Sequence, residues 1–255
     1  MTLQISNLTK AYGGQVVVDD VSFAMPLSGL VGLIGPNGAG KSTLFSLITG
    51  FLDGGAGKVE LAGKALEHLP PFARAQAGMV RTFQVPREYV HLTVRENLMA
   101  AAPVQAGETL ASIFFRPAQV AREEADIGRR VDETLAFLKL DKVAQVPAGR
   151  LSGGQKKLLE LGRALMTGAK LILLDEPFSG VNPVLIEELS TRIRELNARG
   201  VGFLIIEHDL GALSRLVNEM HVMDRGRIIA SGTPKEVLAA PAVREAYLGG
   251  AGAAA

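Results

Sequence analysis

The sequence contains no cysteine and almost no net charge, with 27 lysines and arginines against 26 aspartates and glutamates in 255 residues. Without cysteine the protein has neither disulfides nor thiolate metal sites, which agrees with a reducing compartment. Because the charges balance, little basic excess is left to neutralise phosphates, and this argues against a nucleic-acid binder.

Long apolar segments are missing as well. The longest apolar runs, at residues 171–174 and 203–206, are strand-sized, whereas a membrane-spanning helix needs about 18 apolar residues or more. The first residues, MTLQISNLTK, lack the basic and then apolar order of a signal peptide. We therefore expect no export signal and no membrane span, so that any membrane role would come from a partner.

What the sequence does contain is a set of short strand-like runs. Residues 30–34 (LVGLI), 171–174 (LILL) and 203–206 (FLII) are continuously apolar, as expected of central strands buried on both faces, and helical segments lie between them. Runs within residues 3–25, broken by turn residues, predict antiparallel strands. We predict an α/β fold with a mixed central sheet and an N-terminal antiparallel β subdomain.

Helices are predicted in the middle and at the end of the chain. Thr93 with Glu96, and Thr233 with Glu236, have the spacing of capping boxes. Between the two helix starts, residues 222–230 predict a hairpin. A further helix is predicted by four apolar residues at helical spacing, namely Ile127, Val131, Leu135 and Leu138.

These signals together predict a single domain over residues 1–248. Its core comprises residues 1–84 and 161–248, and a helical subdomain is inserted at residues 85–160. Residues 249–255 (GGAGAAA) offer nothing to pack and are expected to form a flexible tail.

A phosphate-binding loop follows the first apolar strand. Residues 35–42 (GPNGAGKS) match G-x-x-x-x-G-K-[ST] in full, with a predicted helix directly after them. Glycines let backbone amides turn towards phosphate oxygens, and the helix N-terminus adds unpaired donors. We expect Lys41 to reach the β- and γ-phosphates of ATP and Ser42 to offer its hydroxyl to Mg²⁺. The expected nucleotide-binding residues here are Gly35, Pro36, Asn37, Gly38, Ala39, Gly40, Lys41, Ser42 and Thr43.

Two acids end another predicted strand. Asp175 and Glu176 follow the apolar run at 171–174, at the carboxyl edge where open α/β sheets bind their ligands. Asp175 fits an acid that holds Mg²⁺, and Glu176 fits one that polarises the attacking water. A strand that simply ends in two solvated carboxylates is the alternative, and the phosphate-binding loop argues against it.

His208 and Tyr12 have two interpretations each. His208 follows the run at 203–206, where it would sense a γ-phosphate, but a lone histidine is as often structural. Tyr12 stands beside a Gly-Gly turn, where it would stack on adenine or simply lie on the surface. From the residues alone, the surface position of Tyr12 is favoured.

Residues 151–155 (LSGGQ) indicate a second helix start with the features of an anion site. Ser152 and Gln155 have capping-box spacing, and Gly153 and Gly154 leave the first amides of the helix bare. The buried stripe of this helix is predicted at Leu158, Leu161 and Leu165. Since this chain already has one P-loop, the helix start would serve an ATP held by a neighbouring subunit. An ordinary capped surface helix is equally compatible with these residues.

The motifs LSGGQ, GPNGAGKST, LILLDEP and EHD together resemble those of the nucleotide-binding subunit of ATP-binding-cassette (ABC) transporters, over nearly the whole chain. LSGGQ between a P-loop and such an acidic strand is highly specific to that superfamily. The stretches STLFSLITGF, VRTFQVPRE, HLTVRENL, DEPFSGVNP, IEHD and AYLG look most like the first of the two ATPase subunits of branched-chain amino acid importers. Related importers serve urea, short amides or aromatic acids.

The resemblance implies roles within one subunit. Tyr12 would stack on adenine, and Gln84, in RTFQ, would touch Mg²⁺ or the attacking water and report to the membrane partner. Glu176 would be the catalytic base and His208 the switch histidine, with Lys41 and Gln84 completing the catalytic set. The metal site would comprise Ser42, Gln84 and Asp175.

The resemblance also implies a dimer. Ser152 and Gly154, with Gly153 and Gln155 beside them, would contact the γ-phosphate of the ATP bound by the other subunit. Asn182 stands where the family most commonly has aspartate, which leaves the coupling through that loop in doubt.

The implied function is an ATPase at the cytoplasmic face of the cell membrane that powers solute import with ATP and Mg²⁺. Its partners would be a second ABC ATPase subunit, transmembrane permease subunits and an extracytoplasmic solute-binding protein, with no nucleic acid. The alternatives are a soluble ABC-type ATPase acting on nucleic acid and a nucleotide-binding scaffold without turnover. The former usually needs coiled-coil insertions, tandem cassettes or zinc cysteines. Glu176, Gln84 and His208 together argue against the latter.

Overall fold

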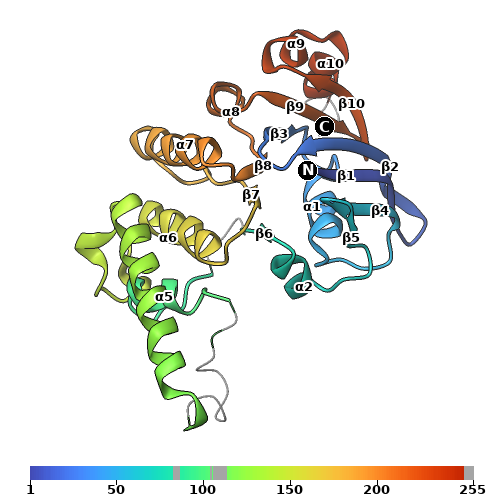
Figure 1. The fold of residues 1–255 in the computed structure, drawn as a ribbon. Helices are drawn as coiled ribbons and strands as arrows, with labels where there is room; N and C mark the ends of the chain where they lie inside the picture. The colour runs from blue at the N-terminus through green and yellow to red at the C-terminus, as the bar shows by residue number, and fades with distance from the viewer. Residues whose placement is uncertain (83–86, 104, 106–113, 250–255) are drawn as a thin grey trace. The chain divides into compact units, whose positions relative to one another are not determined.

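The computed structural model describes residues 1–82, 87–103, 105 and 114–249 (Figure 1). The chain divides into two compact units, each described by itself below. The first comprises residues 1–84, 170–179 and 186–255, and the second comprises residues 85–169 and 180–185. Gln84 lies outside the described residues, as does the predicted tail from residue 250 onward. The predicted domain boundaries stay a prediction, because compactness alone does not show which segments fold together.

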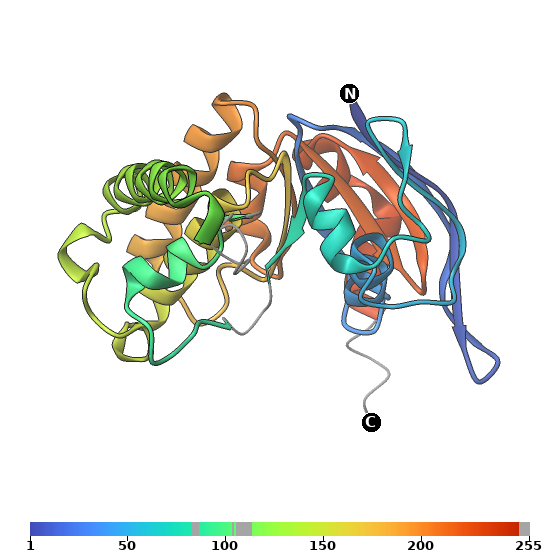
Figure 2. The same cartoon turned by 60° about the horizontal axis from the view of Figure 1, so that its bottom comes forward.

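An antiparallel sheet belongs to the first unit. Its strand order is β2-β1-β4-β5, formed by Gln15–Pro26, Thr2–Tyr12, Ala56–Leu61 and Lys64–Ala65. Burial alternates along much of β1 and β2, as expected of strands with one face on the core. The turn between β1 and β2 projects away from the rest of the unit (Figure 2). The antiparallel strands predicted within residues 3–25 are confirmed.

A mixed sheet forms the other layer of the first unit. Its order is β10-β9-β3-β8-β7-β6, formed by Arg227–Gly232, Glu219–Asp224, Leu30–Ile34, Gly202–Ile206, Leu171–Asp175 and Met79–Arg81. All pairs are parallel except the β9–β10 hairpin. Every residue of β3, β7 and β8 is buried, which confirms the three predicted central strands. The antiparallel pairing of β9 with β10 confirms the predicted hairpin.

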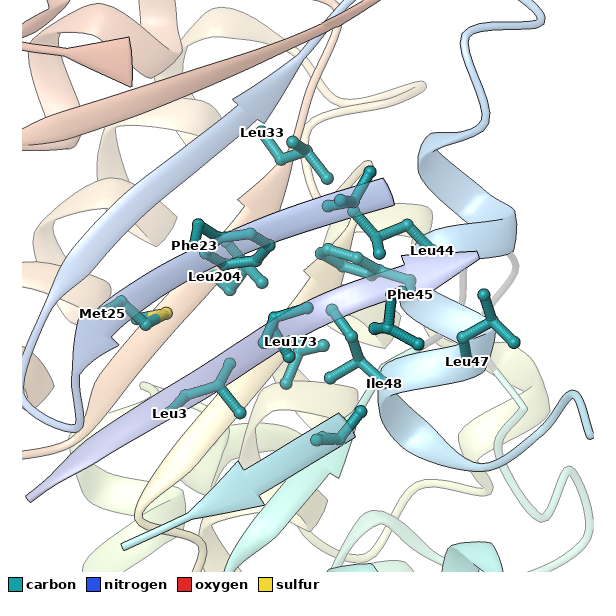
Figure 3. Packing of buried hydrophobic residues seen from close by; sticks show 14 of the residues in the cluster. Leu3, Phe23, Met25, Leu33, Leu44, Phe45, Leu47, Ile48, Leu173 and Leu204 are labelled. Carbon is teal, nitrogen blue, oxygen red and sulfur yellow. The ribbon is translucent and has the colours of Figure 1, made fainter. Parts of the chain in front are cut away.

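The core of the first unit lies between the two sheets, where helix α1 (Lys41–Thr49) packs against both. Figure 3 shows Phe45 of α1 among Phe23 from the antiparallel sheet and Leu173 and Leu204 from the mixed sheet. α1 ends at Thr49, and Gly50 is its C-cap residue. Its last carbonyls accept hydrogen bonds from the buried side chain of Arg74. The other helices that lie wholly in this unit are α2 (Pro71–Gln76), α8 (Leu210–Leu216), α9 (Pro234–Ala239) and α10 (Pro241–Gly249).

The second unit is helical. It contains α3 (Val94–Met99), α5 (Pro117–Phe137), α6 (Gly153–Met166) and two 3₁₀ turns at Asp141–Val143 and Ala148–Arg150. Helix α7 (Pro183–Ala198) begins in this unit and continues in the first. The predicted stripe is buried at Ile127, Val131, Leu135 and Leu138. The predicted capping boxes are present on α3, α6 and α9.

Some elements differ from the expectations. Strands β4, β5 and β6 and helix α2 were not predicted, because they are short and lack a clear periodic pattern. Leu165 was predicted to be buried in α6 but is only half-buried, and Leu159 is buried instead. In the described part of the chain, no helix has the length and hydrophobicity to cross a membrane.

Candidate functional site

The P-loop follows β3 and is held against two other segments by backbone contacts. At Gly35 the backbone has φ 153°, and a Cβ there would lie 2.1 Å from the carbonyl oxygen of Met223. At Gly40, with φ 98°, a Cβ would lie 2.4 Å from the carbonyl oxygen of Val17. The amide of Gly226 also donates to the carbonyl of Ala39 at 3.0 Å. Glycine is therefore required at both positions for conformation and for space.

Lys41 is the first residue of α1 and its side chain is buried. Its Nζ donates to the carbonyl oxygens of Gly35 and Pro36, at 2.7 and 2.9 Å. Burial lowers the pKa of Lys41, and the nearby charges of Glu176 and Asp175 oppose that shift. The ammonium group is thus hydrogen-bonded to the P-loop itself, and it would leave these carbonyls to bind a phosphate.

A cavity of about 250 Å³ opens over the P-loop. It brings together residues that are far apart in the sequence, because the loops after β3, β7 and β8 meet at one edge of the sheet. Its lining comprises Val17, Asn37, Gly38, Ala39, Gly40, Lys41, Ser42, Thr43, Glu176 and His208. Pro36 lines a second cavity of about 500 Å³, shared with the β9–β10 turn and α10.

Glu176 and His208 contact each other in this cavity. Nε2 of His208 lies 2.9 Å from Oε1 of Glu176. Glu176 has a left-handed backbone, with φ 49°, and its amide donates to the carbonyl of Ile206. Because a non-glycine residue rarely adopts this conformation, the turn after β7 aims this carboxylate at a local conformational cost.

Asp175 is buried one residue before Glu176, at the end of β7. Its Oδ2 accepts a hydrogen bond from Nη2 of Arg81 at 2.5 Å, and both side chains are 8% exposed. A carboxylate and the Ser42 hydroxyl are hard oxygen ligands of the kind that Mg²⁺ uses together with substrate phosphates. The donor set therefore fits a magnesium–nucleotide site, and Arg81 is the cation that pairs with Asp175 in this structure.

Glu207 joins the loops that carry Glu176 and His208. Its buried carboxylate accepts hydrogen bonds from the amide of Phe178 at 2.6 Å and from the amide of His208 at 3.0 Å. Burial raises the pKa of Glu207, opposed by these amide donors, while the charge of Glu176 raises it further. Glu207 thus fixes both backbone segments of the Glu176–His208 pair.

The LSGGQ segment belongs to the second unit, where it begins α6. The hydroxyl of Ser152 accepts from the amide of Gln155, whose side chain accepts from the amide of Ser152. A Cβ on Gly153 would meet open space, whereas a Cβ on Gly154 would lie 1.5 Å from a methyl carbon of Leu185. Ser152 and Gly153 are exposed, whereas Gly154 is buried and packs against Leu185.

One predicted nucleotide ligand, Tyr12, does not line this cavity. Tyr12 lies at the end of β1, 48% exposed, with Nζ of Lys10 5.3 Å from the centre of its ring. Gln84 lies outside the described residues. The predicted P-loop residues Asn37 to Thr43, Glu176 and His208 are brought together, and Asp175 is buried behind them against Arg81.

Sequence reasoning missed Arg81 and Glu207. Arg81 lies in RTFQ at the end of the short strand β6, and Glu207 lies in IEHD directly after the buried strand β8. A charged residue at the carboxyl end of a buried strand was the signal used for Asp175. The same signal identifies Glu207, whereas Arg81 ends a strand too short to be predicted.

Comparisons with known proteins agree with this geometry. A family model described as "ABC transporter" matches residues 18–179, more than half of the chain. A second model, described as "Branched-chain amino acid ATP-binding cassette transporter", matches residues 227–253.

Individual relatives cover nearly the whole chain. The chain is 39% identical over 247 residues to the "Probable branched-chain amino acid transport ATP-binding protein LivG" of Archaeoglobus fulgidus, covering 97% of this chain and 95% of that protein. It is 35% identical to the "Lipopolysaccharide export system ATP-binding protein LptB" of Haemophilus influenzae, covering 97% of each. The solved ADP conformation of MJ1267, an ATP-binding cassette of an ABC transporter, superposes with a TM-score of 0.83 at 39% identity, covering 98% and 99% of the two chains.

Proposed function

We propose that this chain powers the import of branched-chain amino acids. It belongs to the ABC transporter family and is an ATP-hydrolysing cassette of that family. The resemblance and the fold predicted from the sequence are confirmed. Two findings support the substrate: the 39% identity to the LivG protein and the C-terminal match at residues 227–253.

The observation that carries the proposal is the shared cavity of the P-loop, Glu176 and His208. A P-loop alone predicts phosphate binding. A carboxylate placed beside it, with a histidine at 2.9 Å, adds the groups needed to orient a water for in-line attack on the γ-phosphate.

In the proposed mechanism, the amides of Asn37 to Thr43 cradle the phosphates, and Lys41 leaves the loop carbonyls for the β- and γ-phosphates. Glu176 accepts the hydrogen bond of the attacking water, and His208 holds the Glu176 carboxylate and approaches the γ-phosphate. Asp175 and Ser42, with Gln84, would hold Mg²⁺. When bound, Mg²⁺ supplies charge that offsets the developing negative charge of the phosphates.

ABC ATP-binding subunits work as dimers with transmembrane permease components. For this chain, Ser152 and Gly153 are exposed at the start of α6, where they and their neighbours Gly154 and Gln155 would bind the γ-phosphate held by the other subunit. Tyr12, exposed on the β1–β2 hairpin, would stack on adenine. Hydrolysis removes the γ-phosphate that bridges the two subunits, and they separate.

The permease contact is proposed at residues 87–92, at the cytoplasmic face of the membrane. Tyr89, Val90 and Leu92 are large apolar residues with more than a third of their surface exposed. Arg163 of α6 donates to the carbonyl of Arg87 and lies over the ring of Tyr89 at 4.9 Å, so this segment is anchored to the signature helix. An extracytoplasmic solute-binding protein would deliver the solute to the permease.

Uptake of radiolabelled leucine by cells that depend on this chain tests the proposal. Replacement of the wild-type chain by Glu176→Gln is expected to abolish ATP-driven leucine uptake. Competition by excess urea, short amides or aromatic acids would reveal one of the related import functions instead. Normal leucine uptake with Glu176→Gln would contradict the proposal.

Lipopolysaccharide export is the second candidate, because the LptB protein is 35% identical over nearly the whole chain. The match at residues 227–253 to the branched-chain amino acid model favours import. Loss of outer-leaflet lipopolysaccharide, with leucine uptake intact, would support export. A nucleic-acid ATPase would instead show DNA-stimulated hydrolysis that weakens steeply with salt.

A further inference from the structure

Arg81 places a buried positive charge directly on Asp175. Nη2 of Arg81 donates to Oδ2 of Asp175 at 2.5 Å, and each side chain is 8% exposed. The resemblance to known motifs assigned no role to this arginine. It is nevertheless the cation that the structure pairs with the proposed magnesium acid.

The strand register explains how the two residues meet. Arg81, the last residue of β6, lies beside Leu173 of the parallel strand β7. Asp175 is two residues further along β7, so its side chain leaves the same face of the sheet as that of Leu173. This face is covered by α1, and the guanidinium carbon of Arg81 lies 5.8 Å from the centre of the Phe45 ring.

The other end of the guanidinium group is held by α1. Nη1 of Arg81 donates to the hydroxyl of Ser46 at 2.9 Å. That hydroxyl in turn donates to the backbone carbonyl of Ser42, one helical turn earlier, at 2.7 Å. Arg81 therefore connects Asp175 to the turn of α1 that carries Ser42, another proposed metal ligand.

A buried carboxylate without a counter-charge is strongly unfavourable, so Asp175 requires a cation in every state of the site. Arg81 meets this requirement by a direct ion pair in the present structure, beside the charge of Lys41, which also interacts with Asp175. A divalent cation arriving at the same carboxylate would meet the positive charge of Arg81 at short range, in a site where water screens little. The two cations cannot both pair fully with Asp175.

We propose that Arg81 is a positioning residue that acts as the counter-ion of Asp175 in the metal-free state, and that Mg²⁺ displaces it when the metal–nucleotide complex binds. The inference rests on the proposed function, in which Asp175 is a magnesium ligand. It adds that the arginine keeps the site ordered before the metal binds, at the cost of some Mg²⁺ affinity. The exchange would also move the side chain of Arg81, which is three positions before Gln84 in the sequence.

The test uses the whole chain in four variants: Arg81→Met, Asp175→Asn, the double variant and Arg74→Met. Arg74 is the matched control, since it is also a buried arginine, and its hydrogen bonds within the described residues go to backbone carbonyls. The readouts are the melting temperature without nucleotide, with and without MgCl₂, and the Mg²⁺ concentration that half-saturates binding of a fluorescent ATP analogue. Arg81→Lys, which retains the charge, serves as a milder substitution if Arg81→Met does not fold.

We expect Arg81→Met to melt at a lower temperature than wild type and MgCl₂ alone to restore part of the loss. The double variant, which removes both charges, should recover without MgCl₂. In Arg81→Met the competing cation is gone. The Mg²⁺ concentration that half-saturates binding of the ATP analogue should therefore fall by about threefold or more. Arg74→Met should also melt earlier, but MgCl₂ should not restore it.

Other outcomes separate the inference from the function on which it rests. If Asp175→Asn keeps the Mg²⁺ dependence of wild type, Asp175 is not a magnesium ligand and the metal role in the proposed function fails. If Asp175→Asn loses that dependence while Arg81→Met requires as much Mg²⁺ as wild type or more, the metal role stands and the exchange of cations is wrong. For Arg81→Lys, which keeps the charge, melting and a Mg²⁺ requirement close to those of wild type support the proposal. A lower melting temperature that MgCl₂ does not restore overturns it.

Discussion

Nε2 of His208 lies 2.9 Å from Oε1 of Glu176, at the adjoining carboxyl ends of β8 and β7. The two residues are 32 positions apart in the sequence, and the parallel pairing of their strands brings them together. This contact joins the group proposed to orient water with the group proposed to sense the γ-phosphate.

Glu176→Gln should separate binding from hydrolysis. The amide keeps the size of the side chain and can still contact His208, but it is a poor base, so kcat should fall by about 100-fold or more. ATP affinity should change little, because the P-loop is intact. Light scattering with Mg-ATP should then show a stable dimer of this variant. A monomer that binds ATP tightly would mean that a different ATPase subunit completes the site.

Ser152→Ala and Thr233→Ala form a matched pair. Each removes the hydroxyl of a capping box, on α6 and α9, and each should lower the free energy of unfolding by about 1 kcal/mol. Only Ser152→Ala should also weaken the ATP-dependent dimer, since only this helix start is proposed to bind a second nucleotide. If the two substitutions affected dimerisation equally, LSGGQ would act only as an ordinary helix cap.

Gly154→Ala should destabilise the second unit, and Gly153→Ala should not. A Cβ on Gly154 would overlap Leu185, at 1.5 Å from its Cδ2, whereas Gly153 has open space. Overpacking of this kind costs about 1–3 kcal/mol, measurable by urea unfolding. Adding Leu185→Ala to Gly154→Ala should restore part of the loss. Without such a recovery, the cost would have to come from the backbone and not from Leu185.

Glu207→Gln should change how stability depends on pH. The folded pKa of Glu207 is raised above its ordinary value of 4.5 by burial, so the folded state holds this proton more tightly than the unfolded state. The stabilisation is complete below pH 4.5 and is lost as the pH rises through the folded pKa. As the pH rises from 4.5, the unfolding free energy of wild type should therefore fall relative to that of Glu207→Gln. A difference that is constant with pH would show that this carboxyl is not perturbed.

The amino-acid sequence alone determined the features whose partners are close along the chain. The capping boxes at Thr93, Ser152 and Thr233 each join residues three positions apart, so a short pattern is enough to predict them. The P-loop is predictable for the same reason, since its glycines and Lys41 are contiguous. The three central strands are predictable because burial on both faces leaves a continuous apolar run.

Only the tertiary structure decided which distant groups complete the site. Arg81 meets Asp175 across 94 residues, and Glu207 reaches Phe178 across 29, because parallel strands bring their carboxyl ends to one edge. A side chain at Gly154 would require Leu185 to move, and this contact between two helices is not contained in the sequence pattern of either helix. Local sequence patterns indicate which residues can bind phosphate or cap a helix. The counter-charges and the packing that hold those residues in place depend on strand register and on contacts between helices. Both form only when the chain folds.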